Sequence, residues 1–137
     1  MEEAVTRARA YVEAGADMIF PEGLGSEAEF AQFAHAMRGK GARTGEGHTG
    51  PYLLANMTEF GKTPLIPISK FAAMGYSCVI YPVSMLRVAM GAVERALEQL
   101  KREGTVEGLL SQMQTRQQLY DLIGYRPGVA WEFPARG

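Results

Sequence analysis

Hydrophobic residues along the chain alternate between helical spacing and short continuous runs. Apolar positions at helical spacing predict a first helix that Gly15 ends, and the run 16–22 then predicts a buried strand. The same alternation recurs twice. A helix that Ser26 is expected to cap precedes the second apolar strand, and a shorter helix that Ser69 is expected to cap precedes the third. Parallel strands joined by right-handed crossovers are the usual result of this order. The pattern therefore predicts an α/β fold.

A long helix follows the third apolar run, which covers residues 76–81. Ser84 is expected to cap this helix, and Gly104 to interrupt it before it continues to about Leu122. Its apolar stripe consists of Leu86, Met90, Val93, Leu97 and Leu100. Three parallel strands leave both edges of a small sheet open, so they fit either an open sheet completed elsewhere or the closing units of a (β/α)8 barrel. We expect a partial barrel domain over residues 1–123 and a C-terminal tail over 124–137.

Polar side chains follow each predicted strand directly, where parallel α/β folds bind their ligands. They are Glu22 after the first strand, Asn56, Thr58 and Glu59 after the second, and Ser84 and Arg87 after the third. Acid, amide, hydroxyl and guanidinium groups at one rim suit a small, oxygen-rich, anionic ligand. Each has a structural alternative: Glu22 could cap the next helix, Asn56 could bond to a loop, and Arg87 could be an exposed cation. Phe60, directly after Glu59, is interpreted as a packing residue.

Arg116 occupies an unexpected place on the last predicted helix. It falls on the same apolar face as Leu109, Met113 and Tyr120. A guanidinium there must find a partner or extend to water, and the carboxylates of a ligand would match its two parallel donors. An internal ion pair with Asp121 or Glu107 is the alternative.

Composition narrows the classes of function. The 137 residues carry a net charge of −1, which gives no basic field for nucleic acid. No apolar run approaches the about 18–20 residues of a membrane helix. The single cysteine, Cys78, excludes an internal disulfide framework and is expected to be inert core, while the glycine-rich segment 39–50 is interpreted as a surface loop. We expect a cytoplasmic protein that binds neither nucleic acid nor membrane.

Five short segments occur in a recognisable order over nearly the whole chain. They are Phe20–Glu22, Leu54–Pro64, Tyr81–Ser84 with Arg87, Glu103–Thr105, and Met113–Arg116. In this order and spacing they resemble methylisocitrate lyases, which belong to the isocitrate lyase and phosphoenolpyruvate mutase superfamily. The resemblance implies a (β/α)8 barrel that uses Mg²⁺ in a retro-aldol cleavage of 2-methylisocitrate to pyruvate and succinate.

The resemblance also implies roles for individual residues. Asn56, Met57 and Thr58 resemble the segment that binds a substrate carboxylate, and Arg87 and Arg116 resemble the paired cations that hold the succinate portion. A homo-oligomer with exchanged C-terminal helices is implied as well.

Glu22 resembles the carboxylate that contacts the metal through water. The metal-binding aspartates and the catalytic cysteine loop of such enzymes have no match in this sequence, and Cys78 does not correspond to that cysteine. We therefore expect only the last three β/α units and an extra C-terminal helix, with no catalytic residue and little activity in this chain alone. The alternatives are a related lyase or hydrolase that acts on oxaloacetate or phosphonopyruvate, and a non-catalytic half-barrel that self-associates.

Overall fold

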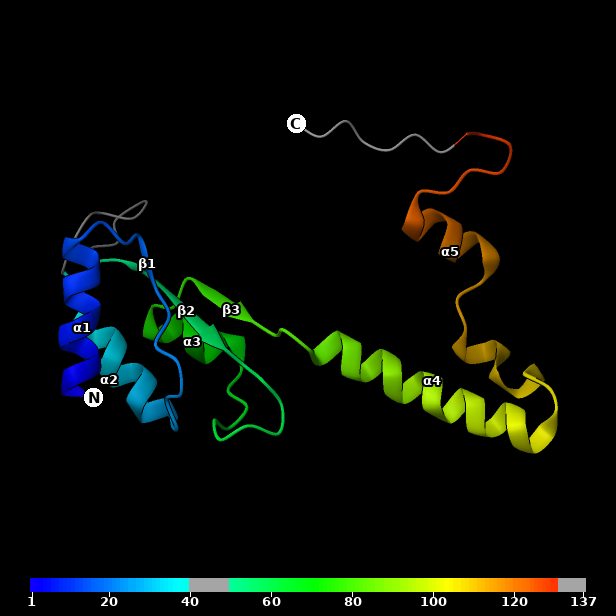
Figure 1. Cartoon of the computed structure of the whole chain (residues 1–137), viewed down its shortest axis with the longest axis horizontal. Helices are drawn as coiled ribbons and strands as arrows, with labels where there is room; N and C mark the ends of the chain where they lie inside the picture. The colour runs from blue at the N-terminus through cyan, green and yellow to red at the C-terminus, as the bar shows by residue number, and fades with distance from the viewer. Residues whose placement is uncertain (40–49, 131–137) are drawn as a thin grey trace. The chain divides into compact units, whose positions relative to one another are not determined.

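The computed structural model describes residues 1–39 and 50–130, and the chain divides into two units, Met1–Ala89 and Met90–Gly137. In chain order the elements are α1 (Glu2–Glu13), β1 (Met18–Ile19), α2 (Glu27–Met37), β2 (Tyr52–Asn56), α3 (Ile68–Met74), β3 (Cys78–Ile80), α4 (Ser84–Glu103), the 3₁₀ helix η1 (Glu107–Gln112) and α5 (Arg116–Ile123) (Figure 1). The predicted surface loop lies outside the described residues except at its two ends, and the last seven residues of the predicted tail also lie outside them.

The first unit contains a parallel sheet with the strand order β1-β2-β3. Met18 pairs with Tyr52, and Leu54 pairs with Cys78, so β2 is the central strand of the described sheet (Figure 1). This arrangement confirms the α/β prediction from the alternating pattern. The outer strands β1 and β3 are shorter than the predicted runs. Cys78 begins β3 and is half-buried, so the prediction that it belongs to the core was wrong.

Aromatic packing forms the centre of the first unit. The rings of Phe30, Phe71 and Tyr76 meet edge to face, with centroids 5.0 Å apart for Phe30 and Phe71 and 5.3 Å apart for Phe71 and Tyr76. Such pairs stabilise a core by about 0.5–1.5 kcal/mol each beyond their buried area. The Tyr76 hydroxyl donates to the carbonyl of Phe30 at 3.3 Å, and burial raises the pKa of this phenol. The predicted apolar face of α2 is confirmed, since Phe30, Phe33 and Met37 are all buried.

Local capping signals determine where α1 ends and where α2 begins. The Ser26 hydroxyl accepts from the backbone N–H of Glu29 at 3.2 Å, which confirms the predicted cap of α2. The Glu29 carboxylate accepts from the N–H of Gly25, one residue before the position that a full capping box would use. Gly15 (φ 105°) follows α1 and confirms the predicted end of that helix.

The start of α3 differs from the prediction. This helix begins at Ile68 with Pro67 at its N-cap, so Ser69 lies inside the first turn and the predicted Ser69 cap was wrong. The fixed φ of proline positions the chain for helix entry without a side-chain cap.

The second unit contains two short helices where the sequence predicted one continuation. Thr115 starts α5 through a complete capping box: its hydroxyl accepts from the N–H of Gln118, and the Gln118 side chain accepts from the N–H of Thr115 at 2.8 Å. A capping box begins a new helix, so η1 and α5 are separate elements. The predicted shared face of Leu109, Met113 and Arg116 was therefore wrong.

The long helix α4 follows β3 after three connecting residues. Its predicted apolar stripe is solvent-exposed, with Leu97 at 59% exposure as an example. Ser84 is the first helical residue rather than the residue before it, which corrects its predicted role as cap. None of the helices in the described ranges is both long enough and apolar enough to cross a membrane.

Candidate functional site

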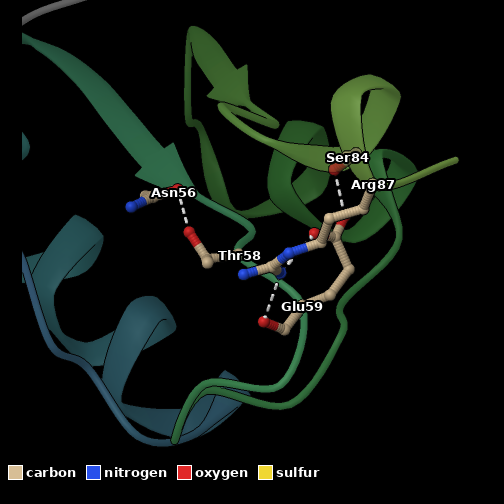
Figure 2. A network of polar contacts seen from close by, with 5 residues as sticks. All are labelled: Asn56, Thr58, Glu59, Ser84 and Arg87. Carbon is tan, nitrogen blue, oxygen red and sulfur yellow. Dashed lines mark hydrogen bonds and ion pairs between the residues drawn. The ribbon is translucent and has the colours of Figure 1, made fainter. Parts of the chain in front are cut away.

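The carboxyl end of β2 alternates between packing and polar side chains. Leu53, Ala55 and Met57 are buried, while Asn56 and Thr58 between and after them are partly exposed. Alternation along an extended chain places these two polar side chains on the opposite side from the core residues. The Thr58 hydroxyl donates to Oδ1 of Asn56 at 2.8 Å (Figure 2). This bond occupies the oxygen of the Asn56 amide and so fixes the orientation of the amide, and the Nδ2 group remains available as a donor.

Met57 was predicted as a substrate-binding residue, and the structure places its side chain in the core at 1% exposure. Its backbone N–H donates to the carbonyl of Ile80 on β3 at 2.9 Å, and its sulfur accepts from the N–H of Ile66. Met57 therefore supports the site by packing, and its side chain is turned away from Asn56 and Thr58.

Glu59 links the connection after β2 to the first turn of α4. The Ser84 hydroxyl donates to Oε1 of Glu59, while Nη1 of Arg87 donates both to the backbone carbonyl of Glu59 at 2.8 Å and to its Oε2 at 3.0 Å (Figure 2). The Glu59 side chain is 22% exposed and that of Arg87 is 43% exposed. We call these three residues the Glu59 network.

Hydrogen bonds keep the Glu59 carboxylate ionised. The bond from the Ser84 hydroxyl is the main cause that lowers the pKa of Glu59, followed by a bond from its own backbone. Burial acts in the opposite direction, and Arg87 adds a further lowering through its hydrogen bond and its charge. At neutral pH the network thus contains one full negative and one full positive charge.

Phe60 adds a third contact to Arg87. The guanidinium carbon of Arg87 lies 5.3 Å from the centroid of the Phe60 ring, within the range of a cation–π interaction. The ring is 96% exposed, so the prediction of a packing residue was wrong. Phe60 also has a φ of 61°, a left-handed conformation that is rare for a bulky residue.

Glu22 lies beyond the end of β1 and is exposed. Ile19 pairs with Leu53, so Glu22 and Asn56 each stand three residues beyond paired positions of neighbouring strands. The connection after β2 also contacts the one after β1, because the Thr63 hydroxyl donates to the carbonyl of Leu24 at 2.6 Å. Glu22 borders a pocket of about 440 Å³ between α1 and β1, whose lining includes Tyr11 and Phe20. The register agrees with the expected convergence at one rim.

The described residues offer few metal ligands. Within 1–39 and 50–130 there is no group of three or more His, Cys, Asp or Glu side chains able to hold an ion. Glu22 is a single exposed carboxylate, which does not form a magnesium site by itself. The donors at the end of β2 are better suited to an anion than to a cation.

Arg116 lies in the other unit. It is the first residue of α5 and is exposed, rather than set on an apolar stripe. Its role as a second ligand-binding cation stays a prediction.

The sequence analysis placed Glu59 and Ser84 at the rim, but it missed the hydrogen bonds by which Glu59 joins Ser84 to Arg87. One signal was available: Ser84 and Arg87 are three residues apart, which puts both on one face of a helix that begins there. Their common partner Glu59 is 25 residues away in the chain. Only tertiary structure brings it to them.

Comparison with known proteins identifies the family. Residues 1–101 match phosphoenolpyruvate phosphomutase. The chain belongs to the phosphoenolpyruvate phosphomutase family. The matched range includes Glu22, Asn56 and the whole Glu59 network, and it ends before Arg116.

Relatives of this phosphoenolpyruvate phosphomutase family member include lyases and a hydrolase. It is 50% identical over 125 residues to "Probable 2-methylisocitrate lyase 1" of Corynebacterium glutamicum, an alignment that covers 91% of this chain and 37% of the relative. The trigonal crystal form of 2,3-dimethylmalate lyase has a TM-score of 0.72 at 35% identity over 90% of this chain and 37% of that chain. Oxaloacetate acetylhydrolase with its product oxalate also has a TM-score of 0.72, at 28% identity over 90% of this chain and 38% of that chain.

The resemblance to methylisocitrate lyases and to their superfamily is confirmed by these matches. The chain spans just over a third of the length of the curated relatives that it matches, for example 37% of the Corynebacterium glutamicum protein.

Proposed function

We propose that this chain forms part of the substrate-binding rim of a methylisocitrate-lyase-like carbon–carbon lyase. The reaction would be the retro-aldol cleavage of 2-methylisocitrate to pyruvate and succinate. The observation that supports this proposal most directly is the set of polar side chains at the end of β2 and the start of α4, where Asn56, Thr58 and Arg87 lie on elements linked by hydrogen bonds. The proposed architecture is the last three β/α units of a (β/α)8 barrel with an extra C-terminal helix.

The geometry at the end of β2 favours a carboxylate ligand. Oδ1 of Asn56 accepts from Thr58, so the amide has its two Nδ2 hydrogens to donate. Within the described part of the chain, the hydrogen bonds of Arg87 use Nη1 and leave Nη2 and Nε for other acceptors. Neutral and cationic donors match the oxygens of a small polycarboxylate, and Arg116 is proposed as the second cation.

Mg²⁺ belongs to the same proposal through Glu22. Bound in the complete site, Mg²⁺ would supply Lewis-acid polarisation of the substrate oxygens. Glu22 would contact it through water. Because the described residues do not form a complete ligand set, we assign no chemical step and no catalytic residue to them.

The proposal includes a cytoplasmic homo-oligomer with an exchanged helix. The exposed apolar stripe of α4 supports self-association, because Leu86, Met90 and Leu97 are all more than half exposed on one helix. The partners would be a second copy and the small polycarboxylate, with neither nucleic acid nor membrane involved.

A hydrolase or lyase that acts on oxaloacetate or phosphonopyruvate is the second candidate. It is favoured by the structural match to oxaloacetate acetylhydrolase, whose TM-score equals that of the lyase. Both candidates require the same carboxylate-binding rim, and they differ in which acid is turned over.

Titration calorimetry with succinate tests the rim in the full chain. We expect Arg87→Met to weaken succinate binding about tenfold to a hundredfold, because each lost bond is charge-assisted. Arg95→Met is the matched control, since Arg95 is an exposed arginine on the same helix. Equal losses in both variants, or no succinate binding by the unmodified chain, would contradict the proposed rim.

A further inference from the structure

The Glu59 network uses every oxygen that Glu59 offers. Oε1 accepts from Ser84, Oε2 accepts from Arg87, and the backbone carbonyl also accepts from Arg87. Both contacts to Arg87 use the same nitrogen, Nη1. One terminal nitrogen of the guanidinium is therefore engaged by Glu59 alone, while its other nitrogens remain free of described partners.

The surroundings hold Glu59 itself in place. Ser84, which bonds to one carboxylate oxygen, is buried at 8% exposure and lies in the first turn of α4. The backbone carbonyl of Glu59 can move away from Arg87 only if the backbone changes its conformation. A surface ion pair whose members both move freely contributes little to stability or to orientation. This pair is different, because the buried Ser84 hydroxyl holds the Glu59 carboxylate and Arg87 bonds to the Glu59 backbone as well as to its side chain.

Phe60 adds a further contact to Arg87. Its left-handed backbone (φ 61°) turns the chain immediately after Glu59, and its ring lies 5.3 Å from the Arg87 guanidinium carbon. A strained conformation at an exposed phenylalanine persists only where the surrounding contacts stabilise it. The guanidinium thus contacts the Glu59 carboxylate, the Glu59 carbonyl and the Phe60 ring.

We propose that Glu59 is a positioning residue for Arg87, with Ser84 holding Glu59 in turn. Glu59 directs the free nitrogens of the Arg87 guanidinium toward the ligand at the rim that Asn56 and Thr58 form. The ligand is a carboxylate of the small polycarboxylate assigned above, so the inference rests on the proposed function. Glu59 acts through Arg87 and makes no contact with the ligand.

The direction in which anion affinity changes when Glu59 is replaced separates a positioning role from simple electrostatics. Glu59 is a negative charge 3.0 Å from the cation that binds an anion. By charge alone, its removal would strengthen anion binding. If Glu59 positions Arg87, its removal weakens anion binding although the site becomes more positive.

Titration of the full chain with succinate is the first test. Glu59→Gln is expected to weaken succinate binding about tenfold, and Ser84→Ala about threefold, because it removes one of two supports. Glu103→Gln is the matched control: the Glu103 carboxylate also accepts from an arginine, Arg102 at 2.8 Å, and from Gln99 at 3.0 Å, and its pKa is also lowered, mainly by the bond from Arg102. The control is expected to bind as the unmodified chain does. Unchanged or tighter binding by a folded Glu59→Gln variant overturns the positioning role.

NMR of nitrogen-labelled arginine side chains gives a readout that needs no ligand. We expect the Arg87 guanidinium, assigned by its loss in Arg87→Lys, to show separate, slowly exchanging N–H signals that average in Glu59→Gln. If the unmodified chain binds no succinate, the proposed function fails while these signals still decide the positioning role. Averaged Arg87 signals in the unmodified chain would overturn it. Should Glu59→Gln fail to fold, Ser84→Ala provides both readouts.

Discussion

The two units of the chain bury very different amounts of apolar surface. The core cluster of buried residues lies entirely between Val5 and Tyr76, within the first unit. In the described part of the second unit, Leu109 is the one buried hydrophobic residue, whereas Leu110, Leu122 and Val129 are each more than 60% exposed. The first unit is thus stabilised by its own packing. The second unit is held by helix capping and local bonds, and most of its apolar side chains are exposed.

The largest test of this contrast removes a ring from the aromatic core. Phe71 is completely buried, so Phe71→Ala is expected to destabilise the first unit by about 3–5 kcal/mol. Denaturant unfolding, followed by tyrosine fluorescence, measures the loss. Leu122→Ala is the control in the second unit, where 70% exposure predicts a change within about 0.5 kcal/mol. Similar losses for both variants would show that the two units do not differ in this way.

A charge on the exposed stripe of α4 tests what covers it. Leu97→Glu is expected to lower self-association, measured by sedimentation velocity, because a carboxylate would be buried at a helix interface. The free energy of unfolding of the first unit should remain within about 0.5 kcal/mol of the original. Glu98→Gln, a neighbouring exposed position, is the control. A chain that is monomeric without any mutation would rule out the proposed homo-oligomer.

The smallest expected effect is the pH dependence of the Glu59 network. The pKa of Glu59 is lowered in the folded chain, chiefly by the Ser84 hydroxyl, so the unfolded chain binds its proton more readily. The network's contribution to stability is therefore fully present above the ordinary carboxyl value of about 4.3 and is lost as the pH falls through the lowered value. We expect the stability difference between the unmodified chain and Glu59→Gln to shrink on acidification. A difference that does not change with pH would argue against an ionised, hydrogen-bonded Glu59.

Local patterns predicted much of the fold. The α/β order followed from periodicity, and the ends of α1 and α2 followed from Gly15 and Ser26, because such signals act within a few residues. The start of α5 was equally local: Thr115 and Gln118 form a capping box that could have been recognised from the sequence. Its omission led directly to the wrong helical face for Arg116.

The candidate site was less predictable because its contacts are distant in sequence. Asn56 and Thr58 could be predicted because a polar pair directly follows an apolar strand. The bond between Ser84 and Glu59 and the exposed, left-handed Phe60 depend on how the chain turns after β2. Neither periodicity nor propensity specifies that turn.

Adjacent residues at the end of β2 have two different roles, core packing and the presentation of polar groups. Met57 fills the core, and its neighbours Asn56 and Thr58 present polar groups on the opposite side. Insertion or deletion of a single residue within this strand would exchange the two sides, so that the amide entered the core and the thioether the rim. Ligand recognition and core packing at this position therefore depend on the same strand register. Substitutions are a safer route to new specificity than changes in strand length.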